Sequence, residues 1–118
     1  RATPAAPSRR GAPIFLRGSM NGWSTATPLT RAVDGSLSVE LDLAPGDYRF
    51  KLGSEDWRAA DFGTSAGEQV RTDGTPLSLV PHGGNIRVSV ERPSRLLFTL
   101  CPKPDGTGEL TVTIVRGR

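Results

Sequence analysis

Two stretches of strictly alternating polar and apolar side chains, joined by a Pro45-Gly46 turn, limit what this chain can fold into. In residues 36–43, SLSVELDL, every second side chain is apolar, and residues 48–52, YRFKL, repeat the pattern. Successive side chains of an extended strand point to opposite faces, so each stretch has one apolar and one polar face. Pro and Gly between two such stretches favour a tight turn. The pattern predicts a β-hairpin that covers a core with one face only.

The same alternation continues toward the C-terminus, in segments separated by Gly, Pro and Asp. We expect the last of these segments to bury Leu110, Val112 and Ile114. No segment has a 3.6-residue period, although residues 54–60 could form one helical turn. Seven to eight short strands separated by turns predict an all-β fold, an antiparallel immunoglobulin-like β-sandwich. Besides the hairpin, the expected strands are residues 13–17, 77–80, 85–90, 95–101 and 109–115, with a weak strand at 69–71.

Length and charge narrow the function classes. The chain has 118 residues, which suits one domain, and we assign residues 13–118 to a single β-sandwich. Residues 1–12, RATPAAPSRRGA, carry no bulky apolar side chain and are predicted to be a flexible linker or tail. The net charge of +3 comes largely from terminal arginines, so the folded part is near neutral and nucleic acid is not an expected partner. No apolar run is long enough to span a membrane.

The sequence contains little that could carry catalysis. Cys101 is the only cysteine and His82 the only histidine, and no calcium-loop spacing occurs, so we expect neither a metal nor a cofactor. Glu40 and Asp42 project from one strand face about 7 Å apart, a glycosidase-like separation, but a solvated sheet face explains both. We therefore predict no enzymatic activity. Turn formation likewise explains three aspartates that each precede a glycine: Asp34, Asp73 and Asp105.

Two tryptophans lie in polar loops, where no apolar periodicity explains them. Trp23 ends the turn GSMNGW, and Trp57 follows GSED after the second strand of the hairpin, whose outer face ends in Lys51. Such an indole can form a flat platform for a sugar ring. It can also fold back and close the end of the sandwich as a core residue. The residues alone leave both interpretations open.

Residues 14–57 resemble carbohydrate-binding module family 48. Three landmarks carry the resemblance, in order: FLRGSMNGW with its Gly-Ser-x-Asn-x-Trp turn, LAPGDYRFK with a Pro-Gly turn into a Tyr-x-Phe-Lys strand, and a Trp in the next loop. The family includes the glycogen-binding domain of the AMP-activated protein kinase β-subunit. It also includes the N-terminal immunoglobulin-like modules of pullulanases, branching enzymes and other amylase-family enzymes.

The resemblance implies a binding site made of two tryptophans, a lysine and an asparagine. Trp23 and Trp57 match the tryptophans, Lys51 matches the lysine, and Asn85, just after Gly83-Gly84, matches the asparagine. The implied ligand is an α-1,4-linked glucan such as starch, glycogen or a maltodextrin. An indole would cover the apolar face of a glucose ring, while Lys51 and Asn85 would hydrogen-bond its hydroxyl groups.

Two functions follow from the resemblance. The first is a non-catalytic α-glucan-binding module that docks a partner, possibly a covalently linked catalytic domain, onto polysaccharide. The alternative is a structural immunoglobulin-like module of a pullulanase- or amylase-like glycoside hydrolase, without sugar affinity of its own. The presence of both tryptophans favours the first. The resemblance also implies an extracellular or periplasmic location, with a cytoplasmic one left open.

Overall fold

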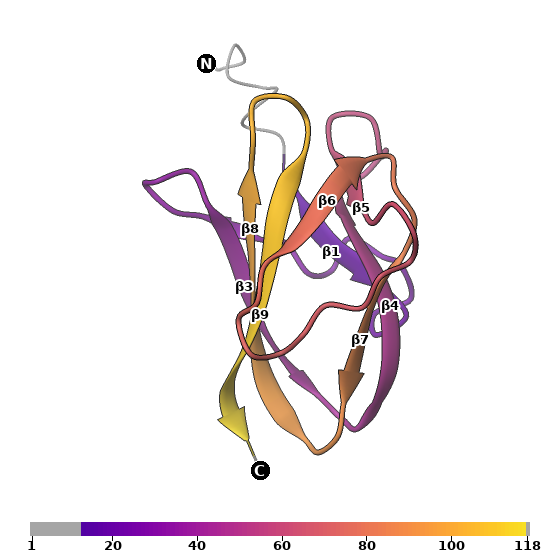
Figure 1. Ribbon diagram of the computed structural model, residues 1–118, viewed down its shortest axis with the longest axis vertical. Helices are drawn as coiled ribbons and strands as arrows, with labels where there is room; N and C mark the ends of the chain where they lie inside the picture. Colours follow the sequence, from indigo (N-terminus) through magenta and orange to yellow (C-terminus); the bar gives the residue numbers. More distant parts are fainter. Residues whose placement is uncertain (1–12, 118) are drawn as a thin grey trace.

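The computed structural model describes residues 13–117, which form short strands joined by turns and loops (Figure 1). The tail predicted at residues 1–12 lies outside the described residues. The strands are β1 (Phe15–Gly18), β2 (Thr30–Arg31), β3 (Leu37–Leu43), β4 (Gly46–Gly53), β5 (Asp61–Gly63), β6 (Leu77–Pro81), β7 (Ile86–Val90), β8 (Ser94–Pro102) and β9 (Gly108–Gly117).

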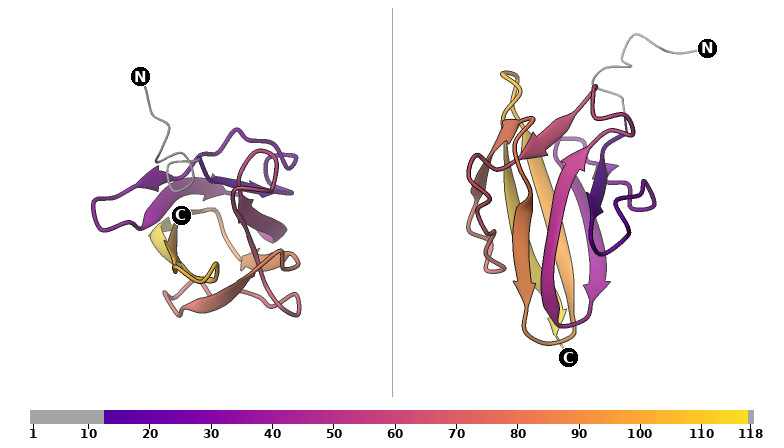
Figure 2. Two further views of the ribbon diagram at one scale, coloured as in Figure 1. Left: turned by 90° about the horizontal axis from the view of Figure 1, so that it is seen from above. Right: turned by 90° about the vertical axis from the view of Figure 1, so that its right-hand side faces the viewer.

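The strands form two layers. In one, β4 pairs with β1 along one edge and with β7 and β5 along the other; in the other, the order is β2, β3, β8, β9, β6. Every pairing between named strands is antiparallel. The layers are continuous through β5 and β6, which pair with each other, and β6 crosses obliquely between them (Figure 1). The two views of Figure 2 show the layers facing each other across a common interior.

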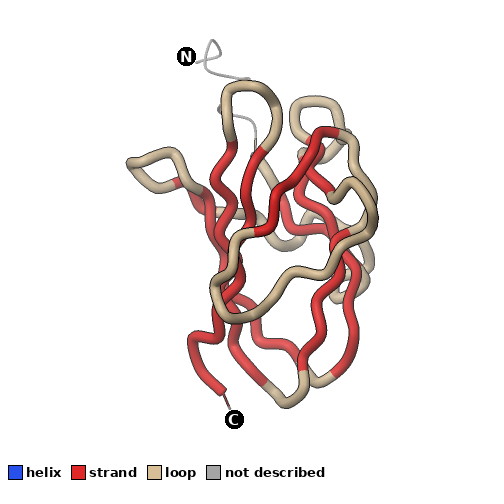
Figure 3. The backbone as a smooth tube through the Cα atoms, in the orientation of Figure 1, coloured by secondary structure: helices blue, strands red, loops and turns tan. Residues whose placement is uncertain are grey.

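The predicted fold class is confirmed. Residues 13–117 contain no helix (Figure 3), so residues 54–60 form turns rather than a helical turn. Residues 13–117 form nine strands where seven to eight were predicted. Strands β2 and β5 were missed because they have only two and three residues, too few for alternation to be visible. The weak strand expected at residues 69–71 is reduced to an isolated parallel bridge between Gln69 and Arg87.

The core lies where the alternating side chains of both layers meet. Phe50 of β4 and Phe98 of β8 are fully buried, and their rings meet edge to face with centroids 5.4 Å apart. Tyr48 packs at the border of the core, and its hydroxyl donates a hydrogen bond to the Ala44 carbonyl. The prediction for Ile114 is wrong: 52% of it is exposed, and it pairs with Leu96 directly beside the point where the β8–β9 pairing shifts register between Arg95 and Leu96.

Candidate functional site

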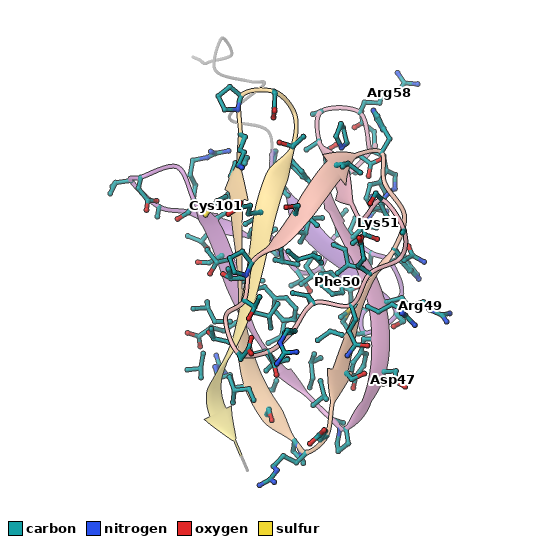
Figure 4. All side chains as sticks on the ribbon, in the orientation of Figure 1. Asp47, Arg49, Phe50, Lys51, Arg58 and Cys101 are labelled. Carbon is teal, nitrogen blue, oxygen red and sulfur yellow. The ribbon has the colours of Figure 1, made fainter. Side chains whose placement is uncertain are left out.

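The polar face of β4 forms the base of the candidate site. Asp47, Arg49 and Lys51 lie on its outer side, whereas Phe50 points between the layers (Figure 4). The registers place Arg17 of β1 directly opposite Lys51, and Arg87 of β7 directly opposite Arg49. Four basic side chains therefore occupy neighbouring positions on the outer face of this layer.

The loop that carries Trp23 is fixed by the asparagine two residues before it. The Asn21 side chain accepts a hydrogen bond from the Gly18 amide and donates to the Leu16 carbonyl and the Thr27 hydroxyl. The Trp23 amide donates to the Gly18 carbonyl at 2.9 Å. The Gly-Ser-x-Asn-x-Trp pattern is therefore a self-bonded turn that presents the indole beside β4.

The loop that carries Trp57 is fixed by Ser54, which is buried although polar. Ser54 and Ala60 exchange backbone and hydroxyl hydrogen bonds and so close the loop. The Asp56 carboxylate accepts from the Arg58 amide and the Ser54 hydroxyl, and these two bonds lower the pKa of Asp56. Trp57 is thus held on a short loop that is closed by its own hydrogen bonds.

Both tryptophans have left-handed backbones. Their φ angles are each 62°, in a region that bulky residues rarely adopt because Cβ approaches the carbonyl oxygen. Residues in such conformations cluster at ligand sites, where the surrounding structure enforces them. Among the described non-glycine residues, only His82 also has a positive φ.

Trp23 and Asn85 line one groove of about 500 Å³ on this face, which we call the Trp23 groove. Its sides are the loop around Trp23 and the segment around Gln69, and its floor is formed by the paired strands β4 and β7. The groove is rich in polar side chains, and those that line it besides Trp23 and Asn85 are Ser19, Asp47, Tyr48, Arg49, Gln69, Arg87 and Ser89.

Lys51 and Trp57 lie together in a second group, which we call the Trp57 cluster, completed by Arg17 and Asp61. The Lys51 ammonium pairs with the Asp61 carboxylate at 2.7 Å, with only 16% and 10% of the two side chains exposed. It also lies 5.1 Å from the centroid of the Trp57 ring. Gly53 makes room for that ring, since a Cβ there would approach Trp57 Cε3 to 2.5 Å.

Arg17 connects the two groups. Its Nε donates to the Trp23 carbonyl at 3.0 Å, and its Nη1 donates to the carbonyls of Ser54 and Glu55 at 3.1 and 2.8 Å. The same guanidinium lies 4.4 Å from the centroid of the Trp57 ring, within the range of a cation–π contact. One side chain thus fixes the spacing of the two tryptophan loops.

The four residues implied by the resemblance fall into two neighbouring pairs on one outer face. Trp23 and Asn85 share the groove, whereas Lys51 and Trp57 contact each other. Sequence reasoning missed Arg17, Arg49 and Arg87 as members of the site. The signal was present, because alternation places Arg49 on the face of Lys51 and Arg87 on the face of Asn85.

The carboxylates considered as a glycosidase pair have a structural partner. Arg95 of β8 donates to Glu40 at 2.6 Å and to Asp42 at 2.9 Å, on the other layer and away from both tryptophans. Within residues 13–117, no three His, Cys, Asp or Glu side chains gather as metal ligands. The described part of the chain also has no helix with the length and apolar character to cross a membrane.

None of the protein-family models matches this chain. A segment of an alpha-amylase from Niallia circulans is 34% identical over 87 residues. The match covers 69% of this chain but 6% of the amylase, so the chain spans a small part of that relative.

A solved structure described as "Ligand induced structure of AmyP-SBD" has a similar fold. It superposes with a TM-score of 0.58 at 17% identity, covering 87% of this chain and 72% of the other. At this identity the likeness concerns the fold, which is the two-layered β-sandwich described above.

Proposed function

We propose that this chain is a non-catalytic α-glucan-binding module that holds an attached enzyme on starch, glycogen or maltodextrin. Trp23, Lys51, Trp57 and Asn85 are the carbohydrate-binding residues in this proposal. Trp23 and Asn85 contact the glucan in the Trp23 groove. Trp57, positioned by Lys51 and Arg17, extends the surface beyond it.

The observation that carries the proposal is the joint presence of Trp23 and Asn85 in one open, polar-lined groove. A glucose ring has an apolar face and a rim of hydroxyl groups. The indole suits the face, and the amide of Asn85 offers both a donor and an acceptor to the rim. Gln69 and Ser89 add further donors and acceptors along the same groove.

The two comparisons support the same class of function. The matching relative is an alpha-amylase, of which this chain resembles only a short part, as an accessory module would. AmyP-SBD is a starch-binding domain whose structure was determined in a ligand-induced state. We extend carbohydrate binding from that protein to this chain, and the choice of an α-glucan rests on the family resemblance.

The expected affinity is modest. If each indole removes on the order of 80 Å² of combined surface from water, it contributes about 2 kcal/mol at roughly 25 cal/mol per Å². Two such contacts and a few hydrogen bonds must offset the cost of immobilising a flexible glucan. The dissociation constant should therefore lie between about 1 μM and 1 mM.

The test is electrophoresis of the purified domain in native gels with and without amylopectin. Amylopectin should retard the domain, and Trp23→Ala and Trp57→Ala should each weaken binding about tenfold, the equivalent of about 1.4 kcal/mol. Val33→Ala is the matched apolar control, because Val33 is fully exposed on the β2–β3 loop, outside both groups. Unchanged mobility of the wild-type domain would remove the proposal.

The second candidate is the structural module without sugar affinity. One observation favours it: the Trp57 ring packs against Gly53 and lies close to Arg17 and Lys51. A purely structural tryptophan costs about 3–5 kcal/mol on truncation, whereas a platform residue costs far less. Thermal melting of Trp57→Ala beside the gel assay therefore separates the candidates.

A further inference from the structure

Arg49 and Arg87 form a cross-strand pair of like charges on the floor of the Trp23 groove. They are directly opposite each other in the β4–β7 register, and both are exposed. Like charges directly opposite each other destabilise a sheet, so the fold gains nothing from this pairing. Local rules broken at a cost to stability are a mark of functional sites.

Several other basic side chains on the strands and turns are paired with carboxylates. Arg95 lies between Glu40 and Asp42, and Lys51 pairs with Asp61. By contrast, neither Arg49 nor Arg87 forms an ion pair with a carboxylate anywhere in residues 13–115, the range whose side chains are described.

The surroundings of the two arginines leave their charge available. Arg87 Nε donates to the Gly67 carbonyl, which orients the guanidinium without neutralising it. The Arg49 amide donates a hydrogen bond to the Ser19 hydroxyl, and the Arg49 carbonyl accepts one from the Ser19 amide, so the backbone of Arg49 is fixed to the Trp23 loop. Among the described residues, Asp47 is the one carboxylate that lines the groove; its Oδ1 accepts a hydrogen bond from Ser89 at 2.6 Å, and it forms no ion pair with either arginine. Two cationic groups therefore line the groove beside Trp23.

We propose that the Arg49–Arg87 pair is an anion subsite of the Trp23 groove and that the bound glucan carries phosphate monoesters. A guanidinium presents several donors in a planar fork that matches phosphate oxygens. A phosphate monoester carries about −1.5 to −2 charges near neutral pH. It therefore balances the charge of two guanidinium groups better than a singly charged carboxylate would. Bound there, the phosphate removes the repulsion between the arginines while Trp23 covers a sugar ring.

This inference rests on the proposed glucan binding, so the experiment separates the two. Affinity is measured for a phosphorylated amylopectin and for the same preparation after phosphatase treatment. A charge-assisted hydrogen bond contributes enough to predict a roughly tenfold or greater preference for the phosphorylated form. That preference should shrink when NaCl is raised from about 0.1 M to about 1 M, which shortens the Debye length from about 10 Å to about 3 Å.

Arg49→Gln is the principal variant and Arg87→Gln the second, because Arg87 also bonds Gly67. Each should reduce the ratio of the two affinities several-fold toward one. Arg92→Gln removes the same charge from an exposed residue that does not line the Trp23 groove, and it should leave the ratio unchanged. Without ligand, Arg49→Gln should melt at no lower temperature than the wild type, since it relieves like-charge repulsion.

The outcomes are distinct. Equal binding of both amylopectins overturns the anion subsite and leaves the glucan-binding proposal intact. Binding of neither overturns both. A preference for phosphate that survives unchanged in Arg49→Gln and Arg87→Gln overturns the assignment to these residues, as does a melting temperature lowered by several degrees in Arg49→Gln.

Discussion

Trp23 and Trp57 are related by more than side-chain type. Each has a φ angle of 62°, and each ends a tight turn whose hydrogen bonds come from a residue upstream, Asn21 or Ser54. A left-handed conformation costs a non-glycine residue roughly 1–2 kcal/mol. The hydrogen bonds of the two turns offset this cost, and the result is a pair of indoles in fixed positions beside the same sheet.

Arg17 is the residue on which we expect the relative position of these indoles to depend. Arg17→Lys keeps the charge but cannot reproduce three hydrogen bonds from one planar group to the carbonyls of Trp23, Ser54 and Glu55. We expect amylopectin affinity to fall about tenfold and stability to fall by about 1–3 kcal/mol. Gel retardation and thermal melting measure the two effects.

Arg95→Lys is the control for that experiment. Arg95 also bonds two partners with its guanidinium, but on the other layer. It should lower stability without changing affinity when measured well below the melting temperature. If Arg17→Lys behaves in the same way, Arg17 is a structural residue and does not position the site.

Single residues mark the limit of what the sequence predicts about this site. Alternation correctly places Lys51 on the outer face of its strand, because the period of a strand is a local property. The partners of Lys51 are not local: Asp61 comes from β5, and the Trp57 ring depends on space left by Gly53. Arg17 was missed for the same reason, since two of its three carbonyl partners lie 37 and 38 residues away.

At the level of elements, prediction succeeded for the strands of four or more residues, including β1 and β6, and failed for the two shortest, β2 and β5. Strands β3, β4, β7, β8 and β9 follow from alternation over five or more residues. The short β2 and β5 form because a neighbouring strand supplies their hydrogen bonds, which no local pattern reveals. The isolated bridge at Gln69 is a similar case, since it depends on β7.

Three of the turns that join these elements have the same hydrogen-bond pattern. Asp34, Asp73 and Asp105 each accept hydrogen bonds from both the amide and the hydroxyl of the residue two positions later. Turn formation therefore does explain the three Asp-Gly pairs. The hydroxyl and amide of Thr75, followed by Arg71, lower the pKa of Asp73 from 3.8 to about 2.

The lowered pKa of Asp73 makes the stability of the folded chain depend on pH, and the direction of that dependence follows from the shift. The folded pKa of Asp73 lies below the unfolded value, so its contribution to stability is present above about pH 4 and is lost as the pH falls toward 2. Asp73→Asn can still accept the turn hydrogen bonds but does not titrate. We expect its melting temperature to fall less than that of the wild type between pH 4 and pH 2, by calorimetry at both pH values.

Asp42→Asn serves as the comparison, because it removes a carboxylate from a strand face, beside Arg95, and not from a turn. An identical acid-induced drop in wild type and Asp73→Asn would show that the turn carboxylate does not contribute to acid sensitivity.

At the scale of the whole molecule, the core lies between the two layers and the candidate site lies on one of them. The core side chains of both layers form one buried cluster that includes the contact between Phe50 and Phe98, whereas the candidate site lies on the outer face of one layer only. Phe50 belongs to the same strand as Arg49 and Lys51, one residue from each. Phe98 belongs to the opposite layer, so it stabilises the site only through the core.

This division predicts that stability and binding can be changed separately. Phe98→Ala leaves a cavity between the layers and should cost about 3–5 kcal/mol. Because none of the residues that line the Trp23 groove belongs to β8, the folded fraction of Phe98→Ala should keep wild-type affinity for amylopectin at low temperature. Trp23→Ala should show the opposite behaviour, with affinity reduced about tenfold and a melting temperature close to that of the wild type. Chemical denaturation and gel retardation of both variants give the four values. A folded Phe98→Ala domain with strongly reduced affinity would mean that the groove depends on the packing of both layers.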